Sequence, residues 1–119
     1  MAQFVDLKKL LILINDNKDG PANLILDEGC TFETEDPKPL IKVLNYLINY
    51  LNQFAKQPLE ISLDLRSSDY LMSLMVYTDI AELPPVSDQI NSTLQDYKAK
   101  FEKVHQTGKY LQFKIYFNR

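Results

Sequence analysis

Alternating apolar and polar positions along the second half of the chain predict three β-strands. Over residues 59–66, leucine and isoleucine alternate with polar residues, a pattern typical of a strand with one buried face. A turn at residues 67–69 is followed by a second alternating stretch over residues 70–78, which predicts a hairpin. Residues 110–117 alternate in the same way. We expect this last strand to lie beside the hairpin in one sheet.

Apolar residues at helical spacing predict two helices in the first half of the chain. The first covers residues 4–14, where Asp6 places a carboxylate near the positive N-terminal end of the helix. The longest covers residues 36–55, with Asp36 as the N-cap and Pro37 at the first helical position. The apolar stripe of this longest helix consists of Leu40, Val43, Leu44, Leu47, Leu51 and Phe54.

The remaining segments complete the predicted order of elements. A loop signal covers residues 15–21, and two short extended pieces follow at residues 23–27 and 31–33. Ser87 is expected to cap a third helix that continues to about Val104. The resulting order is helix, strand, strand, helix, strand, strand, helix, strand. It predicts an α/β two-layer sandwich with a mixed, mostly antiparallel sheet covered on one face by three helices.

Length, charge and cysteine content limit the classes of function. The 119 residues suit a single domain over residues 1–119, and a net charge of -3 gives no general attraction to nucleic acid or to anionic lipid. No apolar stretch approaches the length that spans a bilayer, and no signal peptide is recognisable, so we expect a cytoplasmic protein with no membrane contact. Cys30 is the single cysteine, which excludes an internal disulfide and argues against a metal cluster.

Four stretches, with this order of elements, carry a resemblance to a known family. They are residues 4–11, the acidic and proline-rich entry at residues 34–44, the hairpin with its exit at residues 59–79, and residues 109–117. Together they resemble the ATP-binding domain of bacterial sensor histidine kinases. That domain belongs to the ATPase superfamily that also includes gyrase, heat-shock chaperones and mismatch-repair proteins. The resemblance covers almost the whole chain, and it implies a nucleotide site beside the longest helix.

The asparagine motif that the resemblance implies does not match. In the family, an asparagine on the longest helix coordinates the Mg²⁺ that bridges the nucleotide phosphates. The two corresponding positions fall on Tyr46 and Tyr50, whereas Asn45 and Asn49 lie one residue earlier. One residue rotates a helix by about 100°, so these amides are expected on a different face. A tyrosine cannot supply the amide oxygen that a hard cation prefers. The simpler interpretation of the asparagines is an ordinary polar helix face.

The adenine-binding loop that the resemblance implies is altered as well. Asp79 corresponds to the aspartate that accepts the adenine amino group, but it also suits a strand end or a turn. Ala81 and Leu83 stand where the family has glycines, so side chains occupy space that the backbone and the base require. The short connection from Asp79 to Ser87 contains no glycine and leaves no room for a flexible lid over the phosphates.

Other chemically capable residues have simpler explanations. His105, the only histidine, is predicted near the end of the third helix, where a positive charge suits the helix dipole. Cys30 has no base nearby in the sequence and suits a small, half-buried position. The acidic cluster of Glu33, Glu35 and Asp36 fits the charge preference of a helix N-terminus.

The sequence therefore predicts that the chain is no enzyme, holds no cofactor or metal, and binds no nucleotide. The expected remnant of the nucleotide pocket consists of Asn45, Tyr46, Asn49, Tyr50, Asp79, Ala81 and Leu83. We expect a regulatory or scaffolding role in bacterial signal transduction, through a protein partner or through self-association. One alternative is residual binding of ATP or ADP, with Asp79 and Asn49 as anchors. Another is a small-molecule sensor with a closed cavity lined by Tyr46, Tyr50 and Tyr77.

Overall fold

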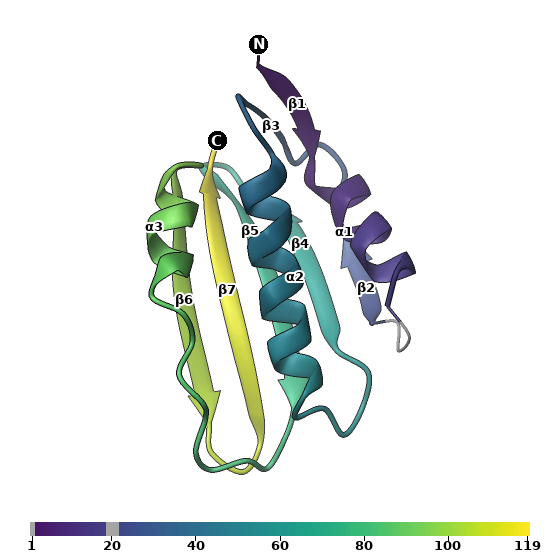
Figure 1. Ribbon diagram of the computed structural model, residues 1–119. Coiled ribbons are helices and arrows are strands. Elements are labelled where there is room, and N and C mark those ends of the chain that lie inside the picture. Colours follow the sequence, from purple (N-terminus) through teal and green to yellow (C-terminus); the bar gives the residue numbers. More distant parts are fainter. Residues whose placement is uncertain (1, 19–21) are drawn as a thin grey trace.

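The computed structural model describes residues 2–18 and 22–119, which form three helices and seven strands (Figure 1). The helices are α1 (Leu7–Asp16), α2 (Lys38–Asn52) and α3 (Gln89–Gln95). The strands are β1 (Gln3–Asp6), β2 (Asn23–Leu26), β3 (Thr31–Thr34), β4 (Glu60–Leu65), β5 (Asp69–Tyr77), β6 (Ala99–Gln106) and β7 (Tyr110–Asn118). The end of the predicted loop at residues 15–21, with Gly20 and Pro21, lies outside the described residues.

Five strands form one mixed sheet in the order β2-β4-β5-β7-β6. β2 runs parallel to β4, and the other neighbours are antiparallel. β1 and β3 form a separate antiparallel pair. The helices α1, α2 and α3 all lie on one face of the five-stranded sheet, with α2 at its centre (Figure 1). The predicted sandwich, with its mixed, mostly antiparallel sheet and three helices on one face, is confirmed.

The alternating sequence patterns produce the core between the sheet and the helices. Successive side chains of a strand point to opposite faces, so one face of β5 and β7 is apolar throughout. The buried residues of these two strands are Tyr70, Met72, Leu74, Val76, Leu111, Phe113, Ile115 and Phe117. Met72 lies opposite Ile115, and Leu74 lies opposite Phe113. Burial of each such side chain contributes about 2 kcal/mol to stability, which makes this pair of strands the centre of the fold.

α2 is a 15-residue amphipathic helix whose leucine stripe faces the sheet. Leu40, Leu44, Leu47 and Leu51 are fully buried. The helix begins at Lys38, one residue later than predicted, with Pro37 at the cap position. Asp36, the predicted N-cap, instead lies one residue before the cap position, and its carboxylate accepts a hydrogen bond of 3.0 Å from the Lys38 backbone N–H. Among residues 2–18 and 22–119, no helix is long and apolar enough to cross a membrane.

The N-terminal segment begins with a strand that the sequence analysis missed. Residues 4–14 were expected to be helical, but β1 covers Gln3–Asp6 and the helix starts at Leu7. Pairing with β3 holds the first residues extended, with Val5 opposite Phe32. Asp6 is the N-cap of α1 and accepts hydrogen bonds from the backbone N–H groups of Lys8 and Lys9. The carboxylate thus lies at the helix N-terminus, as predicted.

The predicted third helix is wrong beyond its first turns. α3 ends at Gln95, and the chain then forms strand β6 up to Gln106. Lys98 adopts a φ of 56°, a left-handed conformation that ends the helical path. Phe101 and Val104, which suggested a continued helix, lie in the sheet instead, opposite Ile115 and Gln112 of β7. Hydrogen bonding along β7 outweighs local helix preference here, and His105 consequently lies on a strand.

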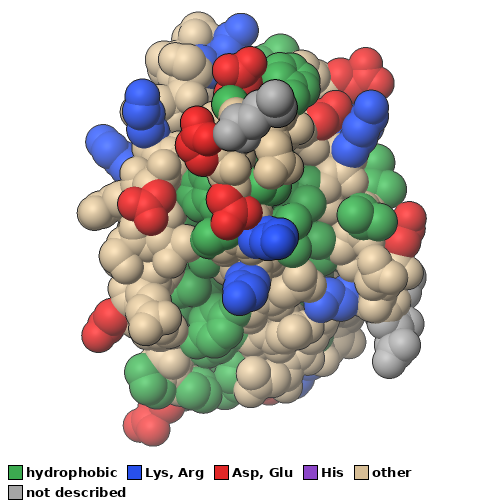
Figure 2. Space-filling view, turned by 45° about the horizontal axis from the view of Figure 1, so that its top comes forward, with side chains coloured by type: hydrophobic (Ala, Val, Ile, Leu, Met, Phe, Trp, Pro, Cys, Tyr) green, Lys and Arg blue, Asp and Glu red, His purple; other side chains and the backbone are tan. Residues whose placement is uncertain are grey.

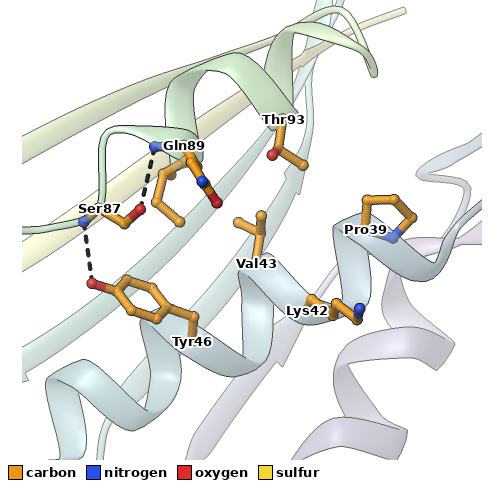
Figure 3. A pocket seen from close by; sticks show the side chains of 8 residues that line it. Pro39, Lys42, Val43, Tyr46, Ser87, Gln89 and Thr93 are labelled. Carbon is orange, nitrogen blue, oxygen red and sulfur yellow. Dashed lines mark hydrogen bonds between the residues drawn. The ribbon is translucent and has the colours of Figure 1, made fainter.

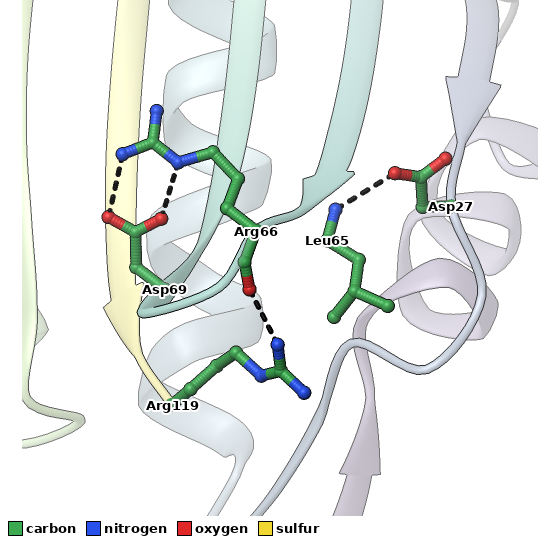
Figure 4. Close-up of polar contacts among 5 residues, drawn as sticks. All are labelled: Asp27, Leu65, Arg66, Asp69 and Arg119. Atoms are coloured by element: carbon green, nitrogen blue, oxygen red, sulfur yellow. Dashed lines mark hydrogen bonds and ion pairs between the residues drawn. The ribbon is translucent and has the colours of Figure 1, made fainter.

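The turn between β4 and β5 is fixed by polar contacts that also hold the C-terminus (Figure 4). Arg66 binds both carboxylate oxygens of Asp69, at 2.6 Å and 2.9 Å. Arg119 donates a hydrogen bond of 2.6 Å to the Arg66 carbonyl oxygen. Asp27, just after β2, accepts a hydrogen bond of 2.9 Å from the Leu65 backbone N–H. These contacts join three chain segments at one end of the sheet.

Candidate functional site

The predicted tyrosine pair on α2 faces the segment that connects β5 to α3. This connecting segment is residues 78–88. The Tyr50 hydroxyl donates a hydrogen bond of 2.6 Å to the Pro84 carbonyl oxygen. One turn earlier, the Tyr46 hydroxyl accepts a hydrogen bond of 3.1 Å from the Ser87 backbone N–H (Figure 3). The spacing of four residues puts both rings on one face of α2, so the helix holds the connecting segment at two points.

The two tyrosines have different surroundings. Tyr50 is buried, and its ring centroid lies 5.4 Å from that of Phe54 and 5.6 Å from that of Phe113. Burial, and to a lesser extent the neighbouring Tyr46, raises the pKa of the Tyr50 hydroxyl. The hydroxyl therefore stays protonated and acts as a donor. Tyr46 keeps 37% of its surface exposed, and its ring centroid lies 6.4 Å from that of Tyr50.

A groove of about 350 Å³ lies between α2 and α3 (Figure 3). The residues that line it are Pro39, Lys42, Val43, Tyr46, Ser87, Gln89, Ile90 and Thr93. Val43 and Ile90 are buried beneath it. Ser87 shapes one end, because its hydroxyl oxygen accepts a hydrogen bond of 3.3 Å from the Gln89 backbone N–H at the start of α3. Lys42 is the one cation among the described residues that line the groove.

Asp79, the expected adenine-binding residue, is held by a lysine that the sequence analysis did not single out. The Lys56 ammonium lies 2.6 Å from the Asp79 carboxylate, and both side chains are largely exposed. The hydrogen bond from Lys56, together with its charge, holds the pKa of the Asp79 carboxyl below its ordinary value. The next residue is tied to β6, because the His105 ring Nε2 lies 3.0 Å from the Ile80 carbonyl oxygen. Asp79 therefore lies at the base of the connecting segment.

The two residues at the expected glycine positions have different environments. Ala81 is exposed. Leu83 is partly buried and packs against the core. The Leu83 side chain therefore helps to hold the connecting segment against the rest of the domain, next to the Pro84 carbonyl that Tyr50 binds.

The asparagines of α2 point toward a different part of the molecule. The amide oxygens of Asn45 and Asn49 accept hydrogen bonds of 2.9 Å and 3.0 Å from the Lys18 ammonium, just after α1. Tyr46 and Tyr50 instead bind the connecting segment. The two pairs thus follow the expected rotation of about 100° between successive helix residues.

The expected pocket is therefore only partly assembled as one site. Tyr46, Tyr50 and the connecting segment come together, whereas Asp79 binds Lys56. Tyr77 lies opposite Tyr110 at the end of β5, and it follows the buried Val76 in the alternation of that strand. This alternation directs Tyr77 to the sheet face away from the helices, apart from the other two tyrosines. Sequence reasoning missed Lys42, Lys56 and the backbone partners at Pro84 and Ser87, because lysines and backbone groups carry no local signal for such contacts.

No family model and no curated protein matches this chain. Solved structures do match. The histidine kinase AdeS of Acinetobacter baumannii superposes with a TM-score of 0.73 at 14% identity, over 99% of this chain and 67% of that chain. The histidine kinase domain of the E. coli osmosensor EnvZ superposes with a TM-score of 0.74 at 8% identity, over 98% of this chain and 88% of that chain. The catalytic domain of histidine kinase ThkA, in a nucleotide-free form, superposes with a TM-score of 0.63 at 11% identity, over 98% of this chain and 96% of that chain.

These matches confirm the predicted resemblance to histidine kinase ATP-binding domains at the level of the fold. They contradict the prediction that the chain is no enzyme. All three similar proteins are histidine kinases, which are enzymes, and the matched part of ThkA is described as a catalytic domain. That prediction rested on side chains such as Tyr46, Ala81 and Leu83, whereas the backbone arrangement of this fold is retained along almost the whole chain.

Proposed function

We propose that this chain is a regulatory or scaffolding domain of bacterial signal transduction that binds another protein at the groove between α2 and α3. The observation that carries the proposal is the double attachment of the connecting segment to α2, through Tyr46 to Ser87 and through Tyr50 to Pro84. Because both hydrogen bonds hold the connecting segment against α2, the rim of the groove has a defined shape that a partner protein can bind.

The chemistry of the groove supports a protein partner. An exposed tyrosine ring, an apolar floor of Val43 and Ile90, and polar groups at Gln89 and Thr93 resemble a contact surface, in which aromatic residues are enriched. A nucleoside triphosphate carries several negative charges, and Lys42 is the one cation among the described lining residues. The face shown in Figure 2 carries acidic and basic side chains interspersed with apolar ones, which also suits protein contacts better than nucleic acid.

A second candidate function is the binding of ATP or ADP. It is favoured by the fold, which this chain shares with histidine kinases, and by the position of the groove beside the helix to which the resemblance assigns the nucleotide site. In this candidate, Lys42 is the residue that meets a phosphate. The Lys56 ammonium is already engaged by Asp79.

Site-directed photo-crosslinking in the producing cells tests the first candidate. A photoreactive phenylalanine analogue at Gln89 or Thr93 is expected to yield one defined adduct with another protein. The same analogue at Lys100, an exposed position on β6, is the matched control. A defined adduct from the rim positions supports the proposal, and adducts that are equally frequent from Lys100 contradict it.

Calorimetric titration separates the second candidate from the first. Protein binding alone predicts no heat of binding with Mg·ATP or Mg·ADP at a dissociation constant tighter than about 1 mM. A tighter and Mg²⁺-dependent association that is weakened by Lys42→Gln would establish the nucleotide site instead. Lys103→Gln, which changes an exposed lysine on β6, is the control for the loss of one positive charge.

A further inference from the structure

α1 carries a second apolar stripe on its outward face. Leu7, Leu11 and Ile14 are buried against the domain, whereas Ile12 and Leu13 expose 37% and 61% of their surface. Lys9 and Asp16 are also exposed. The four outward residues Lys9, Ile12, Leu13 and Asp16 follow the spacing i, i+3, i+4, i+7, so they form one line along the helix. α1 lies at the edge of the helical layer, beside β2 (Figure 1).

The two charges that flank this stripe have no partner within the described part of the chain. Over residues 2–18 and 22–119, neither the Lys9 ammonium nor the Asp16 carboxylate takes part in an ion pair or a side-chain hydrogen bond. The neighbouring Lys8, by contrast, lies 3.2 Å from Glu28. Lys9 and Asp16 are two helical turns apart, or about 10 Å along the axis. The stripe thus presents a positive end, an apolar centre and a negative end.

This order of charges is self-complementary. When two copies of α1 lie antiparallel about a two-fold axis between Ile12 and Leu13, residue numbers that sum to 25 face each other. Ile12 then meets Leu13 of the other copy, and Lys9 meets Asp16 of the other copy, twice by symmetry. A parallel arrangement would instead set like charges side by side.

We propose that a second copy of this chain docks on the outward face of α1 in this antiparallel arrangement. The proposal goes beyond the proposed function, because it adds a second contact surface and names its occupant. A ten-residue helix is about 15 Å long, so the contact is smaller than a standard interface of about 1,600 Å². The dimer is therefore weak and depends on protein concentration. Its position on α1 is separate from the groove between α2 and α3.

Charge reversal tests the geometry directly. Sedimentation equilibrium over a range of protein concentrations, at low salt, is expected to show a monomer–dimer equilibrium. Lys9→Glu and Asp16→Lys each set like charges opposite each other at two places, and each should weaken the dimer about tenfold or more. Both changes favour α1 itself, since they place an acid near its N-terminus and a base near its C-terminus. A loss of association therefore cannot come from a melted helix.

Restoration of the dimer is the decisive result. An equal mixture of the Lys9→Glu and Asp16→Lys variants pairs opposite charges at both ends and should form a heterodimer at least as well as the native chain. The double variant should also dimerise. Leu13→Ser should weaken the dimer, whereas Ile25→Ser, which changes the 71%-exposed isoleucine of β2, should not.

Three results would overturn the proposal: a monomer at all concentrations, reversals without effect, or a mixture that stays monomeric. A monomeric chain that still gives a defined adduct from Gln89 or Thr93 would refute this dimer and keep the proposed function. A dimer without any such adduct would support the α1 interface and refute partner binding at the groove between α2 and α3. Self-association on α1 would then be the protein contact.

Discussion

The Tyr50 hydroxyl donates a hydrogen bond of 2.6 Å to the carbonyl oxygen of Pro84, 34 residues further along the chain. The tyrosine ring is buried against Phe54 and Phe113, and this packing fixes the position of the hydroxyl. A buried side chain of the central helix thereby helps to set the path of the connecting segment that leads to α3. Tyr46 makes the corresponding contact closer to the surface, with the Ser87 backbone N–H.

Tyr50→Phe removes the hydroxyl and keeps the ring packing. We expect the free energy of unfolding to fall by about 1 kcal/mol, the usual net contribution of one hydrogen bond, with added cost because the Pro84 carbonyl loses its partner. Urea denaturation measures the change. Tyr77→Phe is the control, because 41% of Tyr77 is exposed and the effect there should be within about 0.5 kcal/mol of zero. Equal losses in both variants would show that the Pro84 contact has no special role.

Tyr46→Phe should act on local motion more than on global stability. It leaves the Ser87 backbone N–H without its acceptor at a half-exposed site, where water can replace the lost contact. We expect faster amide hydrogen exchange at Ser87 and in neighbouring residues of the connecting segment. Exchange in the core of β5, for example at Leu74, should stay unchanged. Unchanged exchange at Ser87 would mean that Tyr46 does not hold the segment in solution.

The pattern of the chain predicted most of the fold because burial and periodicity agree in its central elements. β5, β7 and α2 have one apolar face each, and that face meets the core as expected. The prediction failed for residues 96–104, where Tyr97, Phe101 and Val104 continue a helical spacing by coincidence. Two of them are sheet residues, and Tyr97 serves a distant contact, since its hydroxyl donates to the Asp36 carbonyl oxygen.

The candidate site was predictable only in part. The spacing of Tyr46 and Tyr50 was sufficient to place both rings on one face of α2. Their partners are backbone groups, the Pro84 carbonyl oxygen and the Ser87 N–H. Because almost every residue carries such groups, the residue types give no signal for these contacts. The Lys56–Asp79 pair joins residues 23 positions apart. It forms because the chain segments that follow α2 and β5 lie close together in the fold.

The Lys56–Asp79 contact predicts a pH dependence of stability. The pKa of the Asp79 carboxyl is lowered in the folded chain, so its contribution is present above the ordinary value of 3.8 and is lost as the pH falls through the lower folded value. Asp79→Asn should therefore reduce stability near neutral pH, and the difference from the native chain should shrink in acid. Urea denaturation at several pH values measures this. Both side chains are exposed, so the effect should also decrease in high salt.

Lys98 is a site where a substitution should stabilise the fold. Its φ of 56° is left-handed, which disfavours an L side chain by about 1 kcal/mol or more. Lys98→Gly removes that strain, and the greater freedom of glycine in the unfolded chain offsets part of the gain. We expect the free energy of unfolding to rise by roughly 0.5 kcal/mol. Lys100→Gly, on β6 two residues later, should instead lower it by about 0.5–1 kcal/mol. A loss of stability in Lys98→Gly would show that the side chain matters more than the backbone conformation.

Cys30 should be unreactive while the chain is folded. Its side chain is fully buried, and this burial, followed by the negative charge of Asp27, raises the pKa of the thiol. Little thiolate forms at neutral pH, and reagents cannot reach it. Ellman's reagent is expected to react slowly with the native chain and rapidly in denaturant. Cys30→Ser tests the same environment, because a hydroxyl at this site costs about 1–3 kcal/mol when it finds no hydrogen bond, whereas Cys30→Ala creates only a small cavity. Fast labelling of the native chain, together with equal stability of the two variants, would mean that the segment between β2 and β3 opens readily and leaves this thiol accessible to solvent.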